Sequence, residues 1–501
     1  MPATAYVGQV VDVPRTRINL ARLLAPDLAL VAAGVTLFYC LFLFQGYQKL
    51  FRDSDAGWHI RTGEAILATG ELPRTDPYSF TRAGQPWFAW EWASDAVVGA
   101  IHRAGGLGGV ALFYGIVIAA GVWLWFRLHW VLHGDFLVAG AMAPLMLTTC
   151  NLHWLARPHV ISWLFLMGLV LYCESERHNP VLLAVFTALW ANVHASFFFA
   201  PLILGIYAVR RRVPYYTVLV AAVAPLANPY GWHLYRHVFR YLTDSDLLAH
   251  IGEFQSFDFH SAGSEQIIAV LILAIGGGTL ALTLGRYEHF ALAVLFSALA
   301  LRSARALPLV ALVGLPIANS AIRATVLPAG ARAYADRLRK LDARLGGWAL
   351  APLVALAAFG ILRTLPAGFP PGQFPVAAYS HIPAGARLFA PDKFGGYLIY
   401  RSEGRMKVFF DGRSDLYGVQ FLKDYGRMAQ VRPGWRALWD SFHFTHALLP
   451  NDYSLVPALE GIGWQVIYRD GTATLLAAPR NFTTAHVLQM ISGFAGVTVC
   501  S

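Results

Sequence analysis

The stretch DSDAGWHIR, which begins at Asp53, places two carboxylates, a tryptophan, a histidine and an arginine just beyond the first strongly apolar segment. Asp53 and Asp55 can face one ligand, where a carboxylate acts as a general base on a hydroxyl or binds a divalent cation such as Mg²⁺ or Mn²⁺. The alternative is that Asp53 caps a helix and Asp55 is solvated. Because Trp58, His59 and the later Glu91 lie near this pair, we take Asp55, Asp53, His59 and Glu91 as candidate catalytic residues.

Basic residues beside other apolar segments could neutralise a phosphate. Arg157 and His159 lie in LARPHVISW, where Pro158 suits the first turn of a helix. A guanidinium beside a helix N-terminus suits an anion, and the alternative is an arginine that reaches for the membrane interface. Arg302 and Arg305, in ALRSARALPLV, need an anionic partner, which is either a protein carboxylate or a lipid phosphate.

Further polar residues lie near the ends of apolar segments. Asn192 and His194, in WANVHASFFF, are predicted to face a cavity or to form a helix–helix hydrogen bond. Glu253, Asp258 and His260 belong to a long polar stretch, where they either line a pocket or are solvated.

The composition is that of an integral membrane protein. Of the 501 residues, 56% are hydrophobic and 14% are charged, whereas a soluble protein carries about 25% charged residues. The four cysteines have no metal-ligand spacing. We expect the first apolar segment to be a retained span rather than a cleaved signal peptide. A span needs about 20 apolar residues, and the candidate spans, about eleven in all, are 26–45, 107–127, 135–151, 159–173, 180–194, 197–209, 215–229, 266–284, 288–303, 306–322 and 348–365.

Lysine and arginine in short loops predict the orientation. Residues 1–25 and the triplet 210–212 are basic, so we place them in the cytoplasm. The opposite face then receives loop 46–106, loop 228–265 and the C-terminal residues 366–501, which brings nearly every polar motif to one side. The net charge of +10 is therefore a topology signal, and we expect no nucleic-acid partner.

Beyond about residue 370 the pattern changes to that of a small extracytoplasmic α/β domain. Strands are predicted for RLFAPD, GYLIYR, KVFFDG, HALLP and QVIYRDGTATLLAA, and helices for FLKDYGRM, GWRALWDSF and SLVPALEGI. In FFDGRSD, Asp411, Arg413 and Asp415 either end a strand and cap a helix or form a tip that closes over the site. In the outer loops, HIRTGEAILATG, EWASDAVVGAIH and HLYRHVFRYL are predicted to be amphipathic helices, of which the first and third lie at the membrane interface.

The first outer loop, with DSDAGWHIRTGEAILATGELPRTDPYSFT and QPWFAWEW, resembles that of the C-type (GT-C) glycosyltransferase superfamily of polytopic membrane enzymes. Within it the chain is similar to a bacterial subgroup, on the segments ARPHVISW, WANVHASF, ANPYGWHLYRHVF, EFQSFDFHS, LRSARALPL, FGGYLIYR and FFDGRSDLYG. The resemblance implies a GT-C-like transmembrane domain over residues 26–365, in the bacterial inner membrane, followed by the outer α/β domain.

The resemblance also implies an activity: transfer of a sugar from a polyprenyl-phosphate donor to an extracytoplasmic glycan, lipid or protein. The first-loop aspartate of the superfamily serves as base or metal ligand, a role that falls on Asp55 and then Asp53, and Glu253 matches a later acidic residue. The residues expected to bind the donor are Trp58, Arg157, His159, His194, Glu253, Arg302 and Arg305. The competing hypothesis is a non-catalytic flippase or assembly scaffold, although the internal repeats typical of a transporter are not evident in the sequence.

Overall fold

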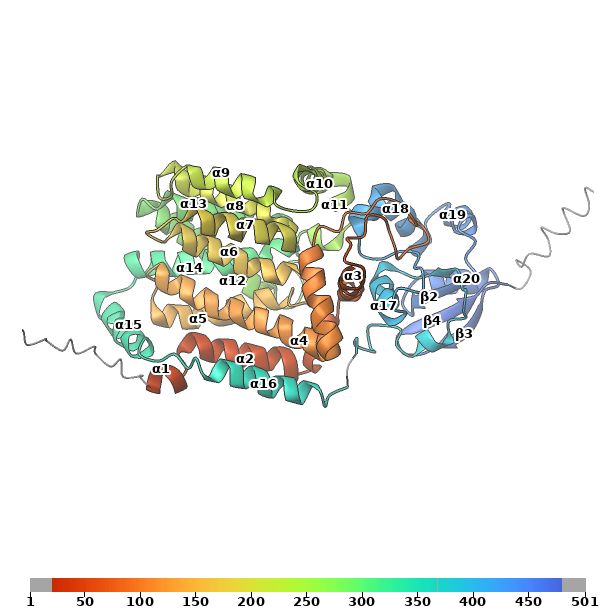
Figure 1. Ribbon diagram of the computed structural model, residues 1–501, viewed down its shortest axis with the longest axis horizontal. Helices are drawn as coiled ribbons and strands as arrows, with labels where there is room; N and C mark the ends of the chain where they lie inside the picture. The colour runs from red at the N-terminus through yellow and green to blue at the C-terminus, as the bar shows by residue number, and fades with distance from the viewer. Residues whose placement is uncertain (1–19, 367, 480–501) are drawn as a thin grey trace, which may run out of the picture.

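The computed structural model describes residues 20–366 and 368–479. A bundle of helices is followed by a smaller unit that contains a mixed sheet, and the two lie end to end (Figure 1). Most of the predicted cytoplasmic segment 1–25 and the last residues of the predicted C-terminal domain, 480–501, lie outside the described residues.

Each predicted span coincides with a helix of the bundle. These helices are α2 (Leu28–Phe42), α4 (Trp92–Val131), α5 (Phe136–Asn151), α6 (His159–Cys173), α7 (Pro180–Val193), α8 (Phe199–Val209), α9 (Tyr216–Val223), α12 (Ser264–Thr283), α13 (Tyr287–Arg302), α14 (Leu307–Thr325) and α16 (Leu350–Leu362). Among the described residues, three helices are long and apolar enough to cross a membrane: α4, α12 and the run Ala304–Thr325, and seven shorter helices are apolar. The protein is thus an integral membrane protein, while the number of crossings stays a prediction.

Further elements lie between these helices and at their ends. They are α1 (Leu20–Leu24), η1 (Gly46–Phe51), α3 (Asp55–Thr69), η2 (Ala195–Phe198), η3 (Ala224–Leu226), α10 (Trp232–Thr243), α11 (Ser245–Leu248), η4 (Gly252–Phe254), η5 (Ala304–Ala306) and α15 (Ala329–Asp342). The helices α3 and α10 fall on two of the segments predicted to be amphipathic helices, and the third segment forms the start of α4.

Capping residues set where several helices begin. The Asp27 side chain accepts a hydrogen bond from the Leu30 N–H (2.9 Å) at the start of α2, and Asp135 caps α5 in the same way. Asn179 caps α7, and Pro180 occupies its first turn, where its missing N–H costs nothing. These local signals explain why span boundaries could be predicted closely from the sequence.

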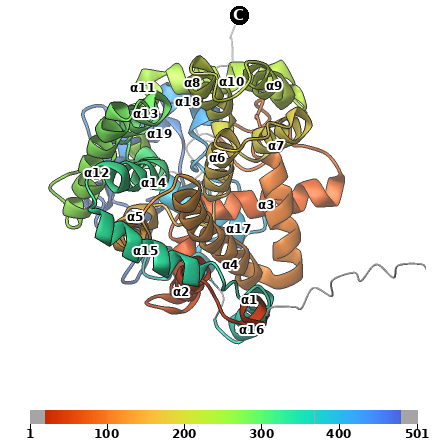
Figure 2. The same ribbon diagram turned by 90° about the vertical axis from the view of Figure 1, so that its left-hand side faces the viewer.

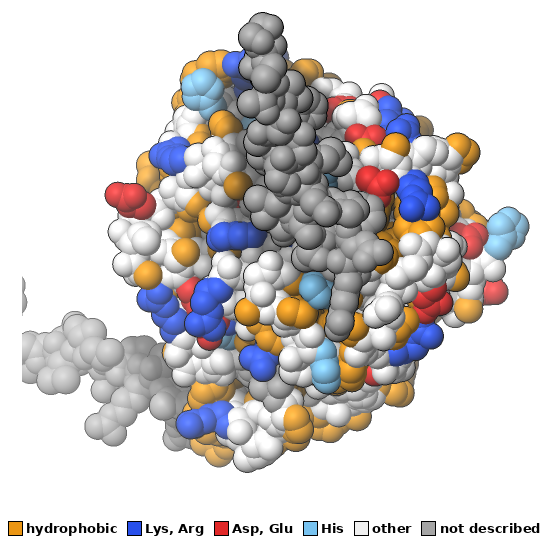
Figure 3. Space-filling model, turned by 90° about the vertical axis from the view of Figure 1, so that its right-hand side faces the viewer, with side chains coloured by type: hydrophobic (Ala, Val, Ile, Leu, Met, Phe, Trp, Pro, Cys, Tyr) orange, Lys and Arg blue, Asp and Glu red, His pale blue; other side chains and the backbone are white. Residues whose placement is uncertain are grey.

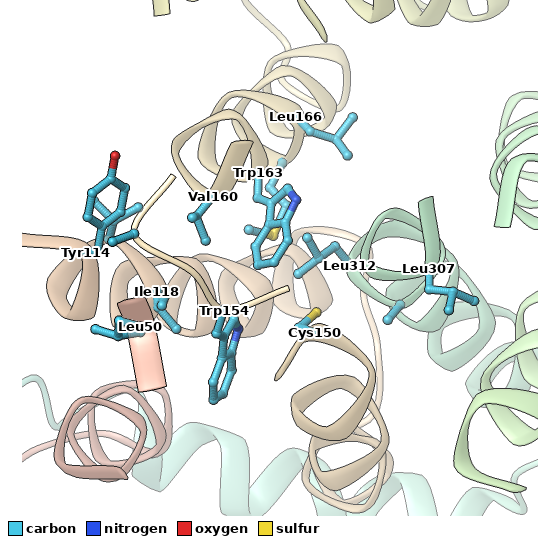
Figure 4. Close-up of a cluster of buried hydrophobic side chains, with 14 of the residues drawn as sticks. Leu50, Tyr114, Ile118, Cys150, Trp154, Val160, Trp163, Leu166, Leu307 and Leu312 are labelled. Carbon is cyan, nitrogen blue, oxygen red and sulfur yellow. The ribbon is translucent and has the colours of Figure 1, made fainter. Parts of the chain in front are cut away.

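The core of the bundle surrounds α14. Its buried residues form a nearly continuous run from Leu307 to Ala321, and a view along the bundle shows other helices around it (Figure 2). Part of this core is a cluster that includes Tyr114, Trp154 and Trp163 (Figure 4). Large apolar side chains are exposed on several helices, among them Phe38 of α2, Leu182 of α7, Ile272 of α12 and Leu356 of α16, as expected of a surface that meets lipid.

Helix α3 is held tightly between α4 and a helix of the C-terminal unit, α17 (Asp392–Arg401). A Cβ atom at Gly57 would lie 2.1 Å from the Gly396 carbonyl oxygen, and one at Gly63 would lie 1.7 Å from the Asp95 carbonyl oxygen. Only glycine permits such close backbone approach. The predicted interfacial helix is therefore largely buried, and it joins the two parts of the molecule.

The C-terminal unit carries a four-stranded sheet in the order β1-β2-β4-β3. Strands β1 and β2 pair in parallel, and β2–β4 and β3–β4 pair antiparallel. The elements are β1 (Leu388–Phe389), α18 (Ser414–Ala429), α19 (Trp435–Ser441), β2 (His446–Pro450), α20 (Leu455–Gly461), β3 (Gln465–Arg469) and β4 (Ala473–Ala477), preceded by η6 (Ala378–His381). The face at this end mixes acidic, basic and apolar side chains (Figure 3).

Two predicted strands of this unit are wrong. GYLIYR lies in helix α17, because Phe394, Tyr397 and Leu398 are buried at helical spacing. KVFFDG forms no strand of the sheet, and only Val408 makes an isolated parallel bridge, to Ser79 of the first outer loop. The other predicted strands and the three predicted helices are present.

Candidate functional site

A cavity of about 610 Å³ lies at the end of the bundle that faces the C-terminal unit. It is bounded by α3, the segment before α4, the starts of α6 and α14, the end of α7, helices α10 and α11, and the first turn of α18. The candidate residues that line it are Asp55, Trp58, Glu91, Arg157, His159, His194, Arg302 and Arg305. Asp53, His59 and Glu253 lie behind this wall and contact its members.

One wall of the cavity is a network of two arginines and three carboxylates. The Arg157 guanidinium lies 2.6 Å from Asp53, 3.0 Å from Asp55 and 2.8 Å from Glu253. Arg305 donates to the other oxygen of Glu253 at 2.9 Å. The network joins loop 46–106 to the loop around η4. Arg157 therefore contacts protein carboxylates and does not reach for the membrane interface, which was the alternative predicted from the sequence.

Local backbone contacts fix the position of these acids. The Asp53 carboxylate accepts a hydrogen bond from the Asp55 N–H at 2.9 Å, so Asp53 organises the start of α3 as well as binding Arg157. Arg52 donates to the carbonyl oxygens of Asn151 and Leu152 at 2.7 and 2.8 Å, which ties the loop to the end of α5. Asp55 is buried rather than solvated.

A second group of titratable side chains occupies the neighbouring wall. His59 Nδ1 lies 2.6 Å from Asp95, and His59 Nε2 lies 3.6 Å from the Glu91 carboxylate. His194 Nε2 lies 3.5 Å from the other Glu91 oxygen, and its Nδ1 lies 2.8 Å from the Ser196 hydroxyl. Glu91 is thus placed between two histidines, and His59 contacts Asp95 and Glu91 rather than Asp55.

Burial and charge shift the pKa values of the acids in different directions. Burial raises the pKa of Asp55, and the Arg157 guanidinium offsets only part of that effect. Burial also raises the pKa of Glu91 to about 7, against the opposing influence of Arg157 and Arg305. For Glu253, burial is outweighed by those two arginines together, and its pKa falls well below the usual range.

The rest of the cavity is apolar. It extends between α6, α8, α13 and α14 over Trp163, Leu166, Leu202, Leu299 and Leu309. A cavity with charged groups at one end and an aliphatic surface at the other suits an amphipathic ligand with a polar head and a long hydrocarbon chain.

The C-terminal unit contributes a wall through the turn before α18. Gly412, Arg413, Ser414 and Asp415 line the cavity, and Asp415 lies 3.2 Å from His237 of α10. A Cβ atom at Gly412 would lie 2.0 Å from an oxygen of Asp55. Only a residue without a side chain allows this turn to approach the carboxylate so closely.

Arg413 of the same turn connects the C-terminal unit to the first outer loop. Its guanidinium lies 2.7 Å from Asp411 and 2.8 Å from Asp76, and it packs over the ring of Trp87. The Tyr417 hydroxyl donates to Asp411 at 2.8 Å. Asp411 and Arg413 thus have a structural role, because they connect this turn to Asp76. The turn itself lies against the cavity, as in the predicted alternative of a tip over the site.

Other candidate residues have simpler surroundings. Arg302 lines the cavity and has no ion-pair partner in the part of the chain that the structure describes. Asn192 accepts a hydrogen bond from the Trp92 indole at 2.8 Å, which is the helix–helix alternative. Asp258 and His260 are exposed and do not line the cavity.

Asp95 is not among the candidate site residues predicted from the sequence, although it contacts His59 directly. It lies four residues after Glu91 in EWASD, and this spacing puts both acids on one side of a helix start. The tryptophans of QPWFAWEW were an equally available signal, since Trp87 and Trp90 line the cavity. Tryptophan suits such a position, because its ring is apolar and its N–H can meet a polar group.

The acids of the site do not fit a divalent cation. Among the described residues, no group of three or more His, Cys, Asp or Glu side chains is placed to hold a metal ion. Asp53 and Asp55, the predicted ligands, both face the Arg157 guanidinium. A guanidinium in that position neutralises the oxygens that a cation would need.

A solved structure shares this architecture. An oligosaccharyltransferase from Archaeoglobus fulgidus in the apo form matches with a TM-score of 0.53 and 12% identity, over 84% of this chain and 69% of that chain. The chain has the GT-C glycosyltransferase fold. ArnT from Cupriavidus metallidurans bound to undecaprenyl phosphate matches with a TM-score of 0.44 and 14% identity, over 90% of this chain and 98% of that chain. No protein-family model and no curated protein sequence matches the chain.

Proposed function

We propose that this protein is a membrane glycosyltransferase that moves a sugar from a polyprenyl-phosphate donor to an acceptor outside the cytoplasm. One observation carries the proposal: a single cavity joins a charged, aromatic end to an apolar end between α6, α8, α13 and α14. A lipid-linked sugar has the same division, because its sugar and phosphate are polar and its polyprenyl chain is not. The GT-C fold, shared with an oligosaccharyltransferase, supports glycosyl transfer as the class of reaction.

Each part of the cavity has a role in this proposal. Arg302 binds the donor phosphate, because its charge is not neutralised by a described carboxylate, whereas Arg157 and Arg305 are both bound to Glu253. Trp58 offers an aromatic surface to the sugar, and His159 and His194 complete the polar end. As the bond to the sugar breaks, negative charge grows on the leaving phosphate, and nearby guanidinium groups stabilise it.

The proposal includes an orientation. We place the protein in the bacterial inner membrane. The basic residues of the loops favour a cytoplasmic N-terminus, so the cavity and the C-terminal unit face the non-cytoplasmic side of that membrane. This places the cavity where a lipid-linked sugar would meet a glycan, lipid or protein acceptor of the cell envelope.

Arg302→Ala tests the donor site. With undecaprenyl phosphate as the probe, we expect binding to the purified protein to weaken about tenfold or more, because a charge-assisted contact contributes roughly 1.5 to 3 kcal/mol. Binding is measured by retention of radiolabelled lipid on protein in nanodiscs. Arg363→Ala is the matched control, since Arg363 is an exposed arginine just after α16 that does not line the cavity.

Unchanged binding by Arg302→Ala would remove Arg302 from the donor site. A second measurement separates transfer from mere binding: release of undecaprenyl phosphate from a labelled pool of lipid-linked sugars, with membranes of a deletion strain as the source of acceptor. Binding without any release by the unaltered protein would support the non-catalytic alternative, a flippase or scaffold.

A further inference from the structure

We propose that Glu91, rather than Asp55, is the general base that removes the proton from the acceptor hydroxyl, and that His59 and Asp95 position it. The inference rests on the proposed transferase function and names the residue that performs its proton transfer. It differs from the role that the resemblance implies for Asp55. The geometry of the two carboxylates is what separates them.

Protein groups lie close to both oxygens of Asp55. One lies 3.0 Å from the Arg157 guanidinium. The other faces the backbone of Gly412, so closely that a Cβ atom there would lie 2.0 Å away. A base must come within hydrogen-bond reach of the proton that it takes, and an acceptor hydroxyl has little room to approach either oxygen.

The Glu91 carboxylate has free oxygens. It forms no hydrogen bond among the described residues, and its two histidine neighbours, His59 and His194, lie 3.6 and 3.5 Å away, beyond ordinary hydrogen-bond length. Its side chain is 12% exposed and lines the cavity. An acceptor hydroxyl can therefore reach a Glu91 oxygen from the cavity without displacing a protein partner.

A buried histidine–carboxylate pair lies directly behind Glu91. His59 is bound to Asp95 through Nδ1 at 2.6 Å, which fixes the ring and directs Nε2 toward Glu91. Buried histidine–carboxylate pairs orient the ring in this way in other proton-transfer sites. The charged or titratable groups around Glu91, from all the elements packed there, are His59, Asp95, Arg157, His194, Glu253, Arg305 and Asp415.

The step balances as follows. The acceptor oxygen forms a bond to the anomeric carbon of the donor sugar, and its proton moves to a Glu91 oxygen. The bond between that carbon and the phosphate oxygen breaks, and its electron pair stays on the phosphate of the released polyprenyl phosphate. Protonated Glu91 then passes its proton to water in the cavity.

Burial raises the pKa of Glu91 to about 7, which suits a base because a base works best when its pKa lies near the working pH. Burial also raises the pKa of Asp55 to about 8, so the geometry and not the pKa separates the two carboxylates. The protonation state of Glu91 sets the direction in which the transfer rate changes with pH. Glu91 must be deprotonated to act, so transfer should rise with pH through about pH 7 and be lost below it. A carboxylate with an ordinary pKa would place that rise near pH 4 to 5.

The test compares pH profiles of undecaprenyl phosphate release by the full chain, with the labelled lipid-linked sugar pool as the probe. Glu91→Gln should lower release about 10²- to 10⁴-fold and abolish the rise near pH 7, whereas Glu91→Asp should restore part of it. Asp55→Asn should lower the rate but keep the rise. Asp95→Asn should displace the rise along the pH axis, since a merely structural role would lower the rate equally at every pH.

Loss of the rise in Asp55→Asn, with the rise retained in Glu91→Gln, would overturn the proposal. A second measurement needs no transfer. Dicyclohexylcarbodiimide reacts with protonated carboxyls in apolar surroundings, and tandem mass spectrometry should locate it on Glu91 below about pH 7 and not well above it. Absence of this pH-dependent labelling would also overturn the proposal. If labelling occurs but the unaltered protein releases no undecaprenyl phosphate, the transferase function fails instead.

Discussion

Two arginines, Arg157 and Arg413, each bring together carboxylates from distant parts of the chain, yet their surroundings differ. The Arg157 side chain is 13% exposed, and its partners Asp53 and Glu253 are 22% and 29% exposed. The Arg413 side chain is 1% exposed, and those of Asp76 and Asp411 are fully buried. Arg157 therefore has partners that a ligand can reach, whereas those of Arg413 are enclosed by protein.

The difference in exposure indicates that the ion pairs of Arg157 can rearrange, whereas those of Arg413 are fixed. Charges that stay in contact with a cavity can exchange one partner for another at modest cost. Fully enclosed charges cannot, because removal of one partner leaves the other buried and unpaired. We infer that Arg413 holds the C-terminal unit against the first outer loop, and that the network around Arg157 belongs to the chemistry of the cavity.

The largest expected effect on stability comes from Arg413→Met. Methionine keeps much of the volume but leaves Asp76 and Asp411 without a cation, and breaking a buried ion pair costs about 3 to 5 kcal/mol. The midpoint of thermal unfolding in detergent should fall by several degrees. Arg405→Met is the control, because Arg405 is 79% exposed and its partner Glu403 is also exposed. An unchanged midpoint for Arg413→Met would contradict the idea of a joint.

Arg157→Met should have a smaller effect on stability and a larger one on transfer. Asp53, Asp55 and Glu253 lose a shared cation. Asp53 and Glu253 are partly exposed and Asp55 lines the cavity, so water can solvate them, and we expect a loss of about 1 to 3 kcal/mol of stability. Undecaprenyl phosphate release should be lost. The double variant Arg157→Met/Asp55→Asn should be more stable than Arg157→Met alone, because one of the unpaired charges is gone. Additive effects of the two changes would show that the two side chains do not interact.

Much of the helical bundle could be predicted because its signals are local. Runs of apolar residues, caps such as Asp27 and Asn179, and prolines at helix starts specify helices from neighbouring residues alone. The order of the predicted spans also indicated that nearly all the polar motifs lie at the same end of the bundle. The local signal failed at GYLIYR, whose aromatic and branched residues suit a strand, while packing of Gly396 against the start of α3 requires a helix there.

The site could be predicted by residue type but not by pairing. Arg157 and its partners Asp53 and Glu253 are about 100 residues apart in the chain, and nothing in the spacing shows which acid meets which base. The sequence therefore predicted a phosphate as the partner of Arg157 and Arg305, whereas in the structure both arginines contact Glu253. Asp95 was overlooked because an acid in the first turn of a helix usually has a structural explanation, and its partner His59 belongs to another helix.

The smallest expected effect is at an exposed ion pair that crosses the same boundary as Arg413. Lys423 of α18 lies 2.5 Å from Asp246 of α11, with both side chains about half exposed. Asp246→Asn should change stability by less than about 1 kcal/mol, and the change should vanish in 1 M salt, because solvent and ions screen exposed charges. The thermal midpoint at low and high salt measures this. If the pair mattered as much as Arg413, attachment of the C-terminal unit would depend on surface charge, and high salt alone should then release it. We expect instead that salt leaves the unit in place, because its attachment depends on the enclosed contacts of Arg413 and on the close packing of α3 against α17.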